Sequence, residues 1–146
     1  MSDKCKVLFI DDEEDLLELL DEHFSSLGFE VYTANGGEEG LKKFRQNKDV
    51  DLVICDISMP RVRGLDVIKK IRMLSEDVPF VFFTGFGSRS NMIEASKYGA
   101  FDFVTKPDVT GLLEVAKRAV EESKSDAKSS DDPLSEYQKL LSNRDT

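Results

Sequence analysis

The feature of this sequence that most restricts its fold is a regular alternation between two kinds of segment. Five short runs are rich in β-branched and aromatic residues, and four of them are apolar almost without interruption. Strands that are covered on both faces have this continuous apolar pattern. The runs are KVLFI (6–10), EVYTA (30–34), DLVIC (51–55), PFVFF (79–83) and FDFVT (101–105). We therefore expect five strands in a sheet that is covered on both sides.

Each strand-like run is followed by a segment whose apolar residues recur at helical spacing. The clearest of these segments runs from Leu16 to Leu27 and stops at Gly28, a residue type that often follows the C-terminus of a helix. The others have their apolar residues within 41–44, 65–74, 92–95 and 112–119. Strands that alternate with helices form parallel sheets with right-handed crossovers. We predict a doubly wound α/β domain with a flavodoxin-like five-stranded parallel sheet, in the order 2-1-3-4-5, and five helices.

The chain of 146 residues is predicted to hold one folded domain followed by a polar extension. The alternation is complete by residue 122, so residues 1–122 are predicted to form the domain. Residues 123–132 are mostly Ser, Lys and Asp and predict a flexible linker, because they offer nothing to bury. Residues 133–146 predict a short tail with the pattern of one amphipathic helix. This tail either stays untethered, covers a face of the domain, or recruits a partner.

The charge and hydropathy of the chain argue against two classes of function. The formal net charge is -9, and no stripe of Lys and Arg is present to neutralise phosphates, so we do not expect direct nucleic-acid binding. No apolar run approaches the roughly 20 residues that a membrane span needs, and the N-terminus lacks the architecture of a signal peptide. We therefore expect a cytoplasmic protein without a membrane partner.

Polar and charged residues gather where the predicted strands end. Asp11 and Asp12 end the first strand, and Asp56 follows the third. Thr84 follows the fourth strand and Lys106 follows the fifth. Ligands of doubly wound sheets bind beyond the carboxyl ends of the strands, where the winding reverses between strands one and three. These five residues are therefore predicted to form one site.

The three carboxylates of this site predict a bound cation. Two carboxylates about 4 Å apart repel each other by about 4 kcal/mol at an effective dielectric constant near 20, and a third adds to the repulsion. Oxygen ligands without imidazole or thiolate favour Mg²⁺ over zinc or copper. Thr84 could donate a hydrogen bond to a phosphoryl group, and Lys106 could supply the positive charge that such a group needs. Asp56 is then the candidate nucleophile, because aspartyl phosphates are known covalent intermediates.

Four stretches of the sequence resemble the receiver domain of two-component response regulators. They are FIDDEED, VICDISMPRVRG, FFTGFG and GAFDFVTKP, in this order along the chain. The resemblance implies that Asp56 accepts a phosphoryl group from a histidine kinase or a phosphotransfer protein in an Mg²⁺-dependent reaction. It implies that Asp12, Asp56 and the backbone carbonyl of Ser58 bind the ion directly. It also implies that Asp11 acts largely through water.

The resemblance also implies a switch. Thr84 and Lys106 would contact the phosphoryl oxygens, and Phe103 would turn inward when Thr84 moves, which changes the face around the fourth helix, fifth strand and fifth helix. The chain would then be a stand-alone signalling phosphoacceptor that switches a downstream protein target, not an enzyme beyond its own phosphotransfer and autodephosphorylation. A dimer of the phosphorylated form stays open, and a cis Lys106–Pro107 peptide bond is expected.

Two other functions stay open from the sequence. A haloacid dehalogenase-like Mg²⁺-dependent phosphatase also uses an Asp nucleophile, but its family expects Asp-x-Asp where this chain has Asp11-Asp12-Glu13. The chain could also be the receiver half of a DNA-binding regulator that lacks its output domain.

Two sequence features are expected to tune the receiver chemistry. Val62 and Arg63 stand where the family often has Met-Asp, which predicts altered kinase contacts or an altered lifetime of the phosphorylated state. Phe86 is predicted to shield the phosphoryl group from water.

Overall fold

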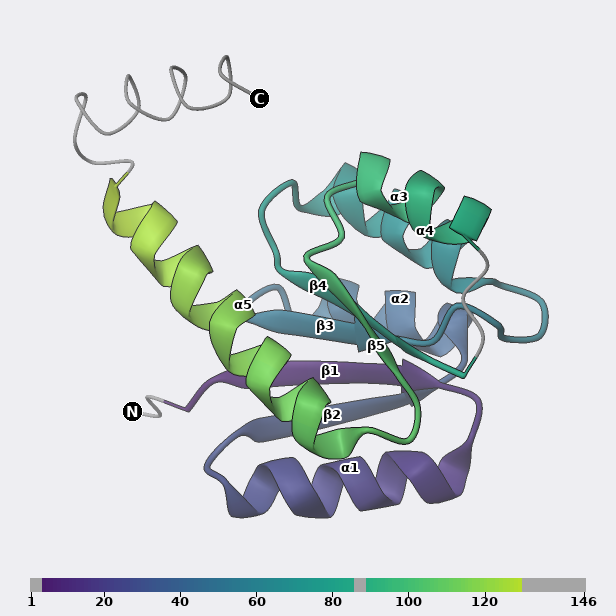
Figure 1. Ribbon diagram of the computed structural model, residues 1–146, viewed down its shortest axis with the longest axis horizontal. Coiled ribbons are helices and arrows are strands. Elements are labelled where there is room, and N and C mark those ends of the chain that lie inside the picture. Colours follow the sequence, from purple (N-terminus) through teal and green to yellow (C-terminus); the bar gives the residue numbers. More distant parts are fainter. Residues whose placement is uncertain (1–3, 86–88, 130–146) are drawn as a thin grey trace.

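The computed structural model describes residues 4–85 and 89–129, and its elements alternate as the sequence predicts (Figure 1). In chain order they are β1 (Lys6–Asp11), α1 (Glu14–Ser26), β2 (Glu30–Asn35), α2 (Gly37–Gln46), β3 (Leu52–Cys55), α3 (Gly64–Leu74), β4 (Phe80–Thr84), α4 (Arg89–Lys97), β5 (Asp102–Thr105) and α5 (Val109–Ser129). The strands form one five-stranded sheet in the order β2-β1-β3-β4-β5, and all four pairings are parallel. The predicted fold class is confirmed.

The sheet has a layer of helices on each face (Figure 1). Helices α1 and α5 contribute to one buried apolar cluster, and α2, α3 and α4 contribute to the other. In β1, Val7 and Phe9 belong to the first cluster while Leu8 and Ile10 belong to the second. Successive side chains of a strand point to opposite faces, so a strand between two helix layers must be apolar at every position. This explains the uninterrupted apolar runs of the sequence.

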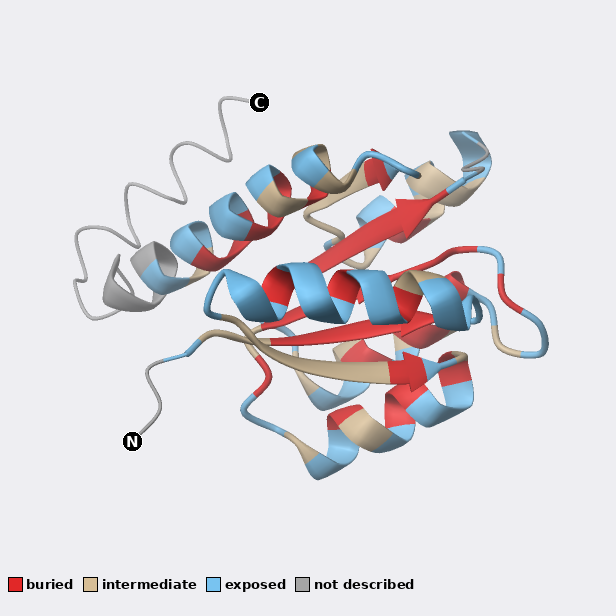
Figure 2. Cartoon of the chain, turned by 90° about the horizontal axis from the view of Figure 1, so that it is seen from below, coloured by how far each residue is buried: buried red, intermediate tan, exposed pale blue. Residues whose placement is uncertain are grey.

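The helices bury one face each and leave the other in water (Figure 2). In α1, Leu17, Leu20 and Phe24 are buried, and the ring of Phe24 meets that of Phe9 edge-on at a centroid distance of 4.9 Å. The helix ends before Gly28, which has φ of 97° and so takes the left-handed conformation expected after a helix C-terminus. Among the described residues, none of the helices combines the length and the apolar character required to cross a bilayer.

Helix α4 is less buried than its apolar residues predict. Of the three residues that mark it in the sequence, Ala95 is fully buried, Met92 is half-buried and Ile93 is 56% exposed. The helix lies at the edge of its layer, where α3 covers one side through contacts such as the Lys69–Glu94 ion pair (2.9 Å). An edge helix of this kind needs only a narrow apolar stripe.

Helix α5 continues through Ser129, beyond the predicted end of the domain at residue 122. The prediction of a flexible linker is therefore wrong for residues 123–129, which are helical. This stretch contains neither Gly nor Pro, and extending a helix already anchored by buried residues such as Ala119 costs far less than starting one. The rest of the predicted linker, 130–132, and the predicted tail, 133–146, lie outside the described residues. The domain boundary at 122 stays a prediction.

Candidate functional site

The carboxyl ends of β1 and β3 lie next to each other, and the three predicted carboxylates meet there. Ile10 is in register with Cys55, and the N–H of Asp56 donates to the carbonyl oxygen of Ile10 (3.0 Å). Asp11 and Asp56 are only 3% and 5% exposed, whereas Asp12 is exposed. Carboxylate oxygens of the three residues lie within 4.8 Å of one another. The strand order therefore brings together the residues that the sequence places at strand ends.

Lys106 reaches into this cluster from the loop after β5. Its Nζ lies 3.0 Å from Oδ2 of Asp11 and 3.1 Å from Oδ2 of Asp56. The N–H of Lys106 donates to the carbonyl oxygen of Thr84 (3.0 Å), and the Lys106–Pro107 peptide bond is cis, as expected. Burial lowers the pKa of Lys106, but hydrogen bonds and charge attraction from the two aspartates outweigh it, and the pKa lies above its usual value. Lys106 is therefore a fixed positive charge at neutral pH.

The crowding of charges changes the pKa of Asp11. Burial raises its pKa to about 6, although Lys106 and the N–H of Glu13 lower it and the nearby charge of Asp56 raises it further. Both oxygens of Asp11 have partners, because Oδ1 accepts from the N–H of Glu13 (3.0 Å) and Oδ2 faces Lys106. The site without a bound cation is therefore unfavourable for a full set of ionised carboxylates.

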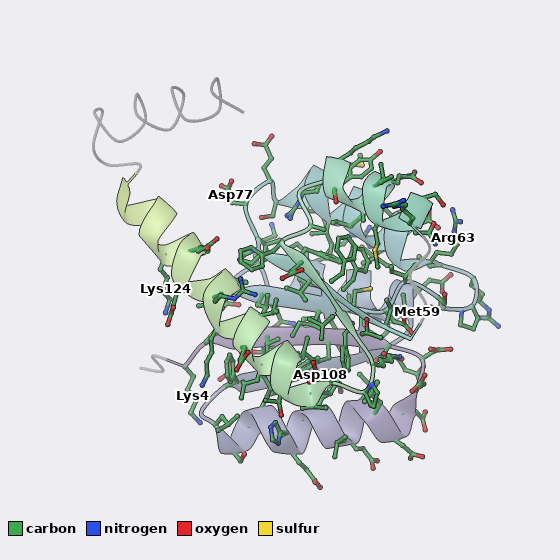
Figure 3. All side chains as sticks on the ribbon, in the orientation of Figure 1. Lys4, Met59, Arg63, Asp77, Asp108 and Lys124 are labelled. Atoms are coloured by element: carbon green, nitrogen blue, oxygen red, sulfur yellow. The ribbon has the colours of Figure 1, made fainter. Side chains whose placement is uncertain are left out.

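The loop from β3 to α3 wraps around Asp56. The N–H of Ser58 donates to Oδ1 of Asp56 (3.3 Å), and the side chain of Met59 is buried. A Cβ atom at Gly64 would come within 2.2 Å of the carbonyl oxygen of Asp56, so this position must be glycine. Figure 3 shows Met59 and Arg63 beyond the carboxyl ends of the strands, at the opposite end of the sheet from Lys4.

The two residues predicted to form the switch lie on neighbouring strands. Thr84 ends β4, is 3% exposed and is in register with Thr105. Phe103 is half-buried on β5 and stacks on Phe82 of β4, with ring centroids 5.5 Å apart and an interplanar angle of 8°. Phe86, which was predicted to shield the site, lies outside the described residues.

Sequence reasoning missed two parts of the site. Glu13 was not among the predicted site residues, yet its Oε1 lies 3.3 Å from Nζ of Lys106. Its position directly after Asp11 and Asp12 was the available signal. A cavity of about 260 Å³ also opens beside Asp12, between the start of α2 and the loop residues Pro60 to Val62. Arg61, on its wall, has φ of 69°, a left-handed conformation that residues other than glycine rarely adopt.

The donor atoms of the cluster fit a hard divalent cation. Asp11, Asp12 and Asp56 offer carboxylate oxygens only. Cys55 is adjacent, but burial raises the pKa of its thiol far above the usual value, so it stays protonated and is a poor ligand. Within the described ranges 4–85 and 89–129, this oxygen-only set matches the preference of Mg²⁺.

Comparisons with known proteins agree with this geometry. Residues 7–117 match the family model described as response regulator receiver domain. The probable transcriptional regulator ycf27 of Guillardia theta is 41% identical over 117 residues, which are 80% of this chain and 45% of that protein. The chain spans about half the length of the curated relatives it matches.

Two solved structures show the same fold. A response regulator receiver domain protein from Clostridium thermocellum is 34% identical with a TM-score of 0.78, over 82% of this chain and 97% of that one. The response regulator protein TrrA from Thermotoga maritima, solved in complex with Mg²⁺ and BeF, is 37% identical with a TM-score of 0.70, over 79% of this chain and 98% of that one.

Proposed function

Because the chain belongs to the response regulator receiver domain family of two-component systems, we propose that its Asp56 accepts a phosphoryl group from a histidine kinase or a phosphotransfer protein. The observation that carries this proposal is the position of Lys106, whose Nζ lies within 3.1 Å of carboxylate oxygens of both Asp11 and Asp56. A buried carboxylate beside a fixed cation and further acidic groups is suited to phosphoryl transfer, where positioning and charge neutralisation do most of the catalytic work.

The transfer forms one bond and breaks one bond. The phosphorus–nitrogen bond of a phosphohistidine breaks, a carboxylate oxygen of Asp56 bonds to phosphorus, and the leaving imidazole nitrogen is reprotonated from solvent. Lys106 stays protonated throughout, because its raised pKa holds the proton, and it attracts the negative oxygens of the group in transfer. Thr84 would donate its hydroxyl proton to a phosphoryl oxygen from the end of β4.

Mg²⁺ would be held by the carboxylates of Asp12 and Asp56 and by the backbone carbonyl of Ser58. When bound, the ion neutralises charge that the phosphoryl oxygens and carboxylates share. Asp11 would act largely through water, as the resemblance to the receiver family implies, while its oxygens accept from the N–H of Glu13 and face Lys106. The mutual proximity of the three carboxylates supports this assignment.

The output is a change of protein partner. Thr84 is drawn toward the phosphoryl group, Phe103 leaves its stacked position on Phe82 and turns inward, and the face formed by α4, β5 and α5 changes. Helix α4 buries little of its surface, with Ala95 as its buried residue among those described, and this suits an element that must move. In this proposal the chain is a cytoplasmic receiver with an unassigned downstream protein, and dimerisation would follow phosphorylation.

A second candidate is a receiver that controls a DNA-binding output domain. The lengths of the curated relatives favour it, because this chain spans about half of each, and one of them is a probable transcriptional regulator. Specific, phosphorylation-dependent retardation of DNA by the full natural protein would support this candidate. The phosphatase alternative is set aside, because the chain belongs to the receiver family.

The test of the proposed reaction is incubation with acetyl phosphate and Mg²⁺, followed by intact mass measurement. Wild type should gain the mass of one phosphoryl group, and Asp56→Ala should gain none. EDTA should abolish the gain in wild type. An equal gain in Asp56→Ala would show that another residue is the acceptor.

A further inference from the structure

The loop from β3 to α3 is held at both ends by close backbone contacts. At its start, the N–H of Asp56 donates to the carbonyl oxygen of Ile10 (3.0 Å). At its end, the N–H of Gly64 donates to the carbonyl oxygen of Ile57 (2.9 Å). A Cβ atom at Gly64 would clash with the carbonyl oxygen of Asp56, at a distance of 2.2 Å. The ends of the loop therefore have little freedom to move relative to β1 and β3.

The tip of the loop rests on another element. Val62 is half-buried and lies against Gly37, the first residue of α2. A Cβ atom at Gly37 would lie 2.7 Å from Cγ1, 2.8 Å from Cβ and 3.0 Å from the carbonyl oxygen of Val62. Real Cβ atoms do not approach other atoms this closely, so the loop meets the helix at a distance that only glycine permits.

The start of α2 is in turn hydrogen-bonded to the end of β1, which carries Asp11 and Asp12 of the carboxylate cluster. The N–H of Gly36 donates to the backbone carbonyl oxygen of Asp11 (3.0 Å). Contacts thus run from Asp11 through Gly36 and Gly37 to Val62, and along the loop to Ser58. The proposed ligands that follow β1 and those that follow β3 are joined at this point, beside the 260 Å³ cavity.

We infer that Val62 is a positioning residue for the ion: by resting on Gly37, it sets the separation between Asp12 at the end of β1 and Ser58 in the loop. Mg²⁺ demands near-ideal octahedral geometry with short bonds, so a small displacement of one ligand lowers its affinity. The inference rests on the proposed function, because it assumes that the ion is bound by Asp12, Asp56 and the Ser58 carbonyl.

The experiment is a calorimetric titration of the full chain with Mg²⁺, comparing wild type with two variants. Val62→Ala removes two methyl groups from the contact without adding atoms, and Gly37→Ala pushes the loop away from α2. Each should weaken Mg²⁺ binding about tenfold, the size of effect typical for residues that orient metal ligands. Melting temperatures in EDTA, measured on the same samples, separate this effect from a general loss of stability.

Val120→Ala is the matched control. It removes the same two methyl groups from a buried valine of α5, which belongs to the apolar cluster on the other face of the sheet from the one that Val62 packs against. It should lower the melting temperature while Mg²⁺ affinity stays within about twofold of wild type.

Either of two results overturns the inference: Val62→Ala that binds Mg²⁺ as tightly as wild type, or Val120→Ala that weakens binding as much as Val62→Ala. Val62→Ala decides alone if Gly37→Ala fails to fold. Wild type that binds no Mg²⁺ at all overturns the proposed function together with this inference, whereas normal wild-type binding with unchanged variants overturns only the role of Val62.

Discussion

One lysine lies beside carboxylates where the strands begin, which we call the amino edge of the sheet, and another where the strands end, the carboxyl edge. The two edges differ in how much water surrounds the charges. At the amino edge, Lys6 at the start of β1 pairs with Asp49, whose side chain is 62% exposed. At the carboxyl edge, Lys106 pairs with Asp11 and Asp56, whose side chains are 5% and 6% exposed. The residue types are the same, and burial is the largest difference between the two edges.

The difference appears in the direction of the pKa shifts. The hydrogen bond from Lys6 lowers the pKa of Asp49, as expected for an ion pair in water. Burial instead raises the pKa of Asp11 to about 6, despite the contact with Lys106. The amino edge therefore carries an ordinary surface ion pair, while the carboxyl edge holds unfavourable negative charge that a cation or a change of protonation can relieve. The proposed reaction takes place at the edge where charge is buried.

Removal of the lysine at the carboxyl edge, whose side chain is 13% exposed, should give the largest effect. Lys106→Met leaves Asp11 and Asp56 buried without their cation, and breaking a buried pair from one side costs about 3 kcal/mol. The melting temperature of the metal-free protein should fall by about 6 to 12 °C, measured at neutral pH in EDTA. A variant as stable as wild type would mean that Lys106 does not compensate the carboxylates.

Acidification should stabilise the metal-free protein, which is the opposite of the usual behaviour of carboxylates. Because the pKa of Asp11 is about 6 in the folded chain and 3.8 in its reference state, the folded state binds more protons between these values. The free energy of unfolding should therefore rise by about 1 kcal/mol between pH 7 and pH 5. Urea denaturation in EDTA at the two pH values measures the change.

The matched control for this pH effect is Asp11→Asn, which should lose the gain. The exposed Asp49 cannot supply it, because its lowered pKa gives a contribution of the opposite sign. A gain that persists in Asp11→Asn would locate the titrating group elsewhere.

Neutralising the proposed phosphoacceptor should stabilise the protein slightly. Asp56→Asn removes one negative charge from the cluster while its amide oxygen still faces Lys106. A relief of roughly 1 kcal/mol would raise the melting temperature of the metal-free protein by about 2 to 4 °C in differential scanning calorimetry. A lower melting temperature would show that the carboxylates do not strain one another.

Replacing the lysine of the amino edge with methionine should have the smallest effect. Lys6→Met breaks the contacts with Asp49 and Glu30, and these lie in water. The melting temperature should stay close to that of wild type, since exposed ion pairs contribute little. A fall as large as that of Lys106→Met would remove the distinction between the two edges.

The fold was predictable because a strand that is buried on both faces has an uninterrupted apolar run in the sequence. Residues 7–10 of β1, 52–55 of β3 and 80–83 of β4 are all apolar for this reason, and the sheet order then places Asp11 beside Asp56. The site was predictable as a set of residues because strand ends are easily recognised and topology determines which ends are neighbours.

Other features depend on contacts between segments that the sequence does not relate. The approach of Val62 to Gly37 joins a loop to the start of α2, and the reach of Lys106 to Glu13 depends on the conformation of a long side chain. The extension of α5 through Ser129 was missed because a polar composition permits a helix without requiring one. The exposure of Ile93 reflects the edge position of α4, which periodicity cannot reveal.

The central claim is that the buried carboxylate of Asp56 is the acceptor of the phosphoryl group. The most direct test is to phosphorylate wild type with acetyl phosphate and Mg²⁺, reduce the acyl phosphate with borohydride, and locate the resulting homoserine by peptide mass spectrometry. We predict homoserine at position 56 alone. Homoserine at position 11 or 12 instead, or none anywhere in well-folded protein, would contradict the account.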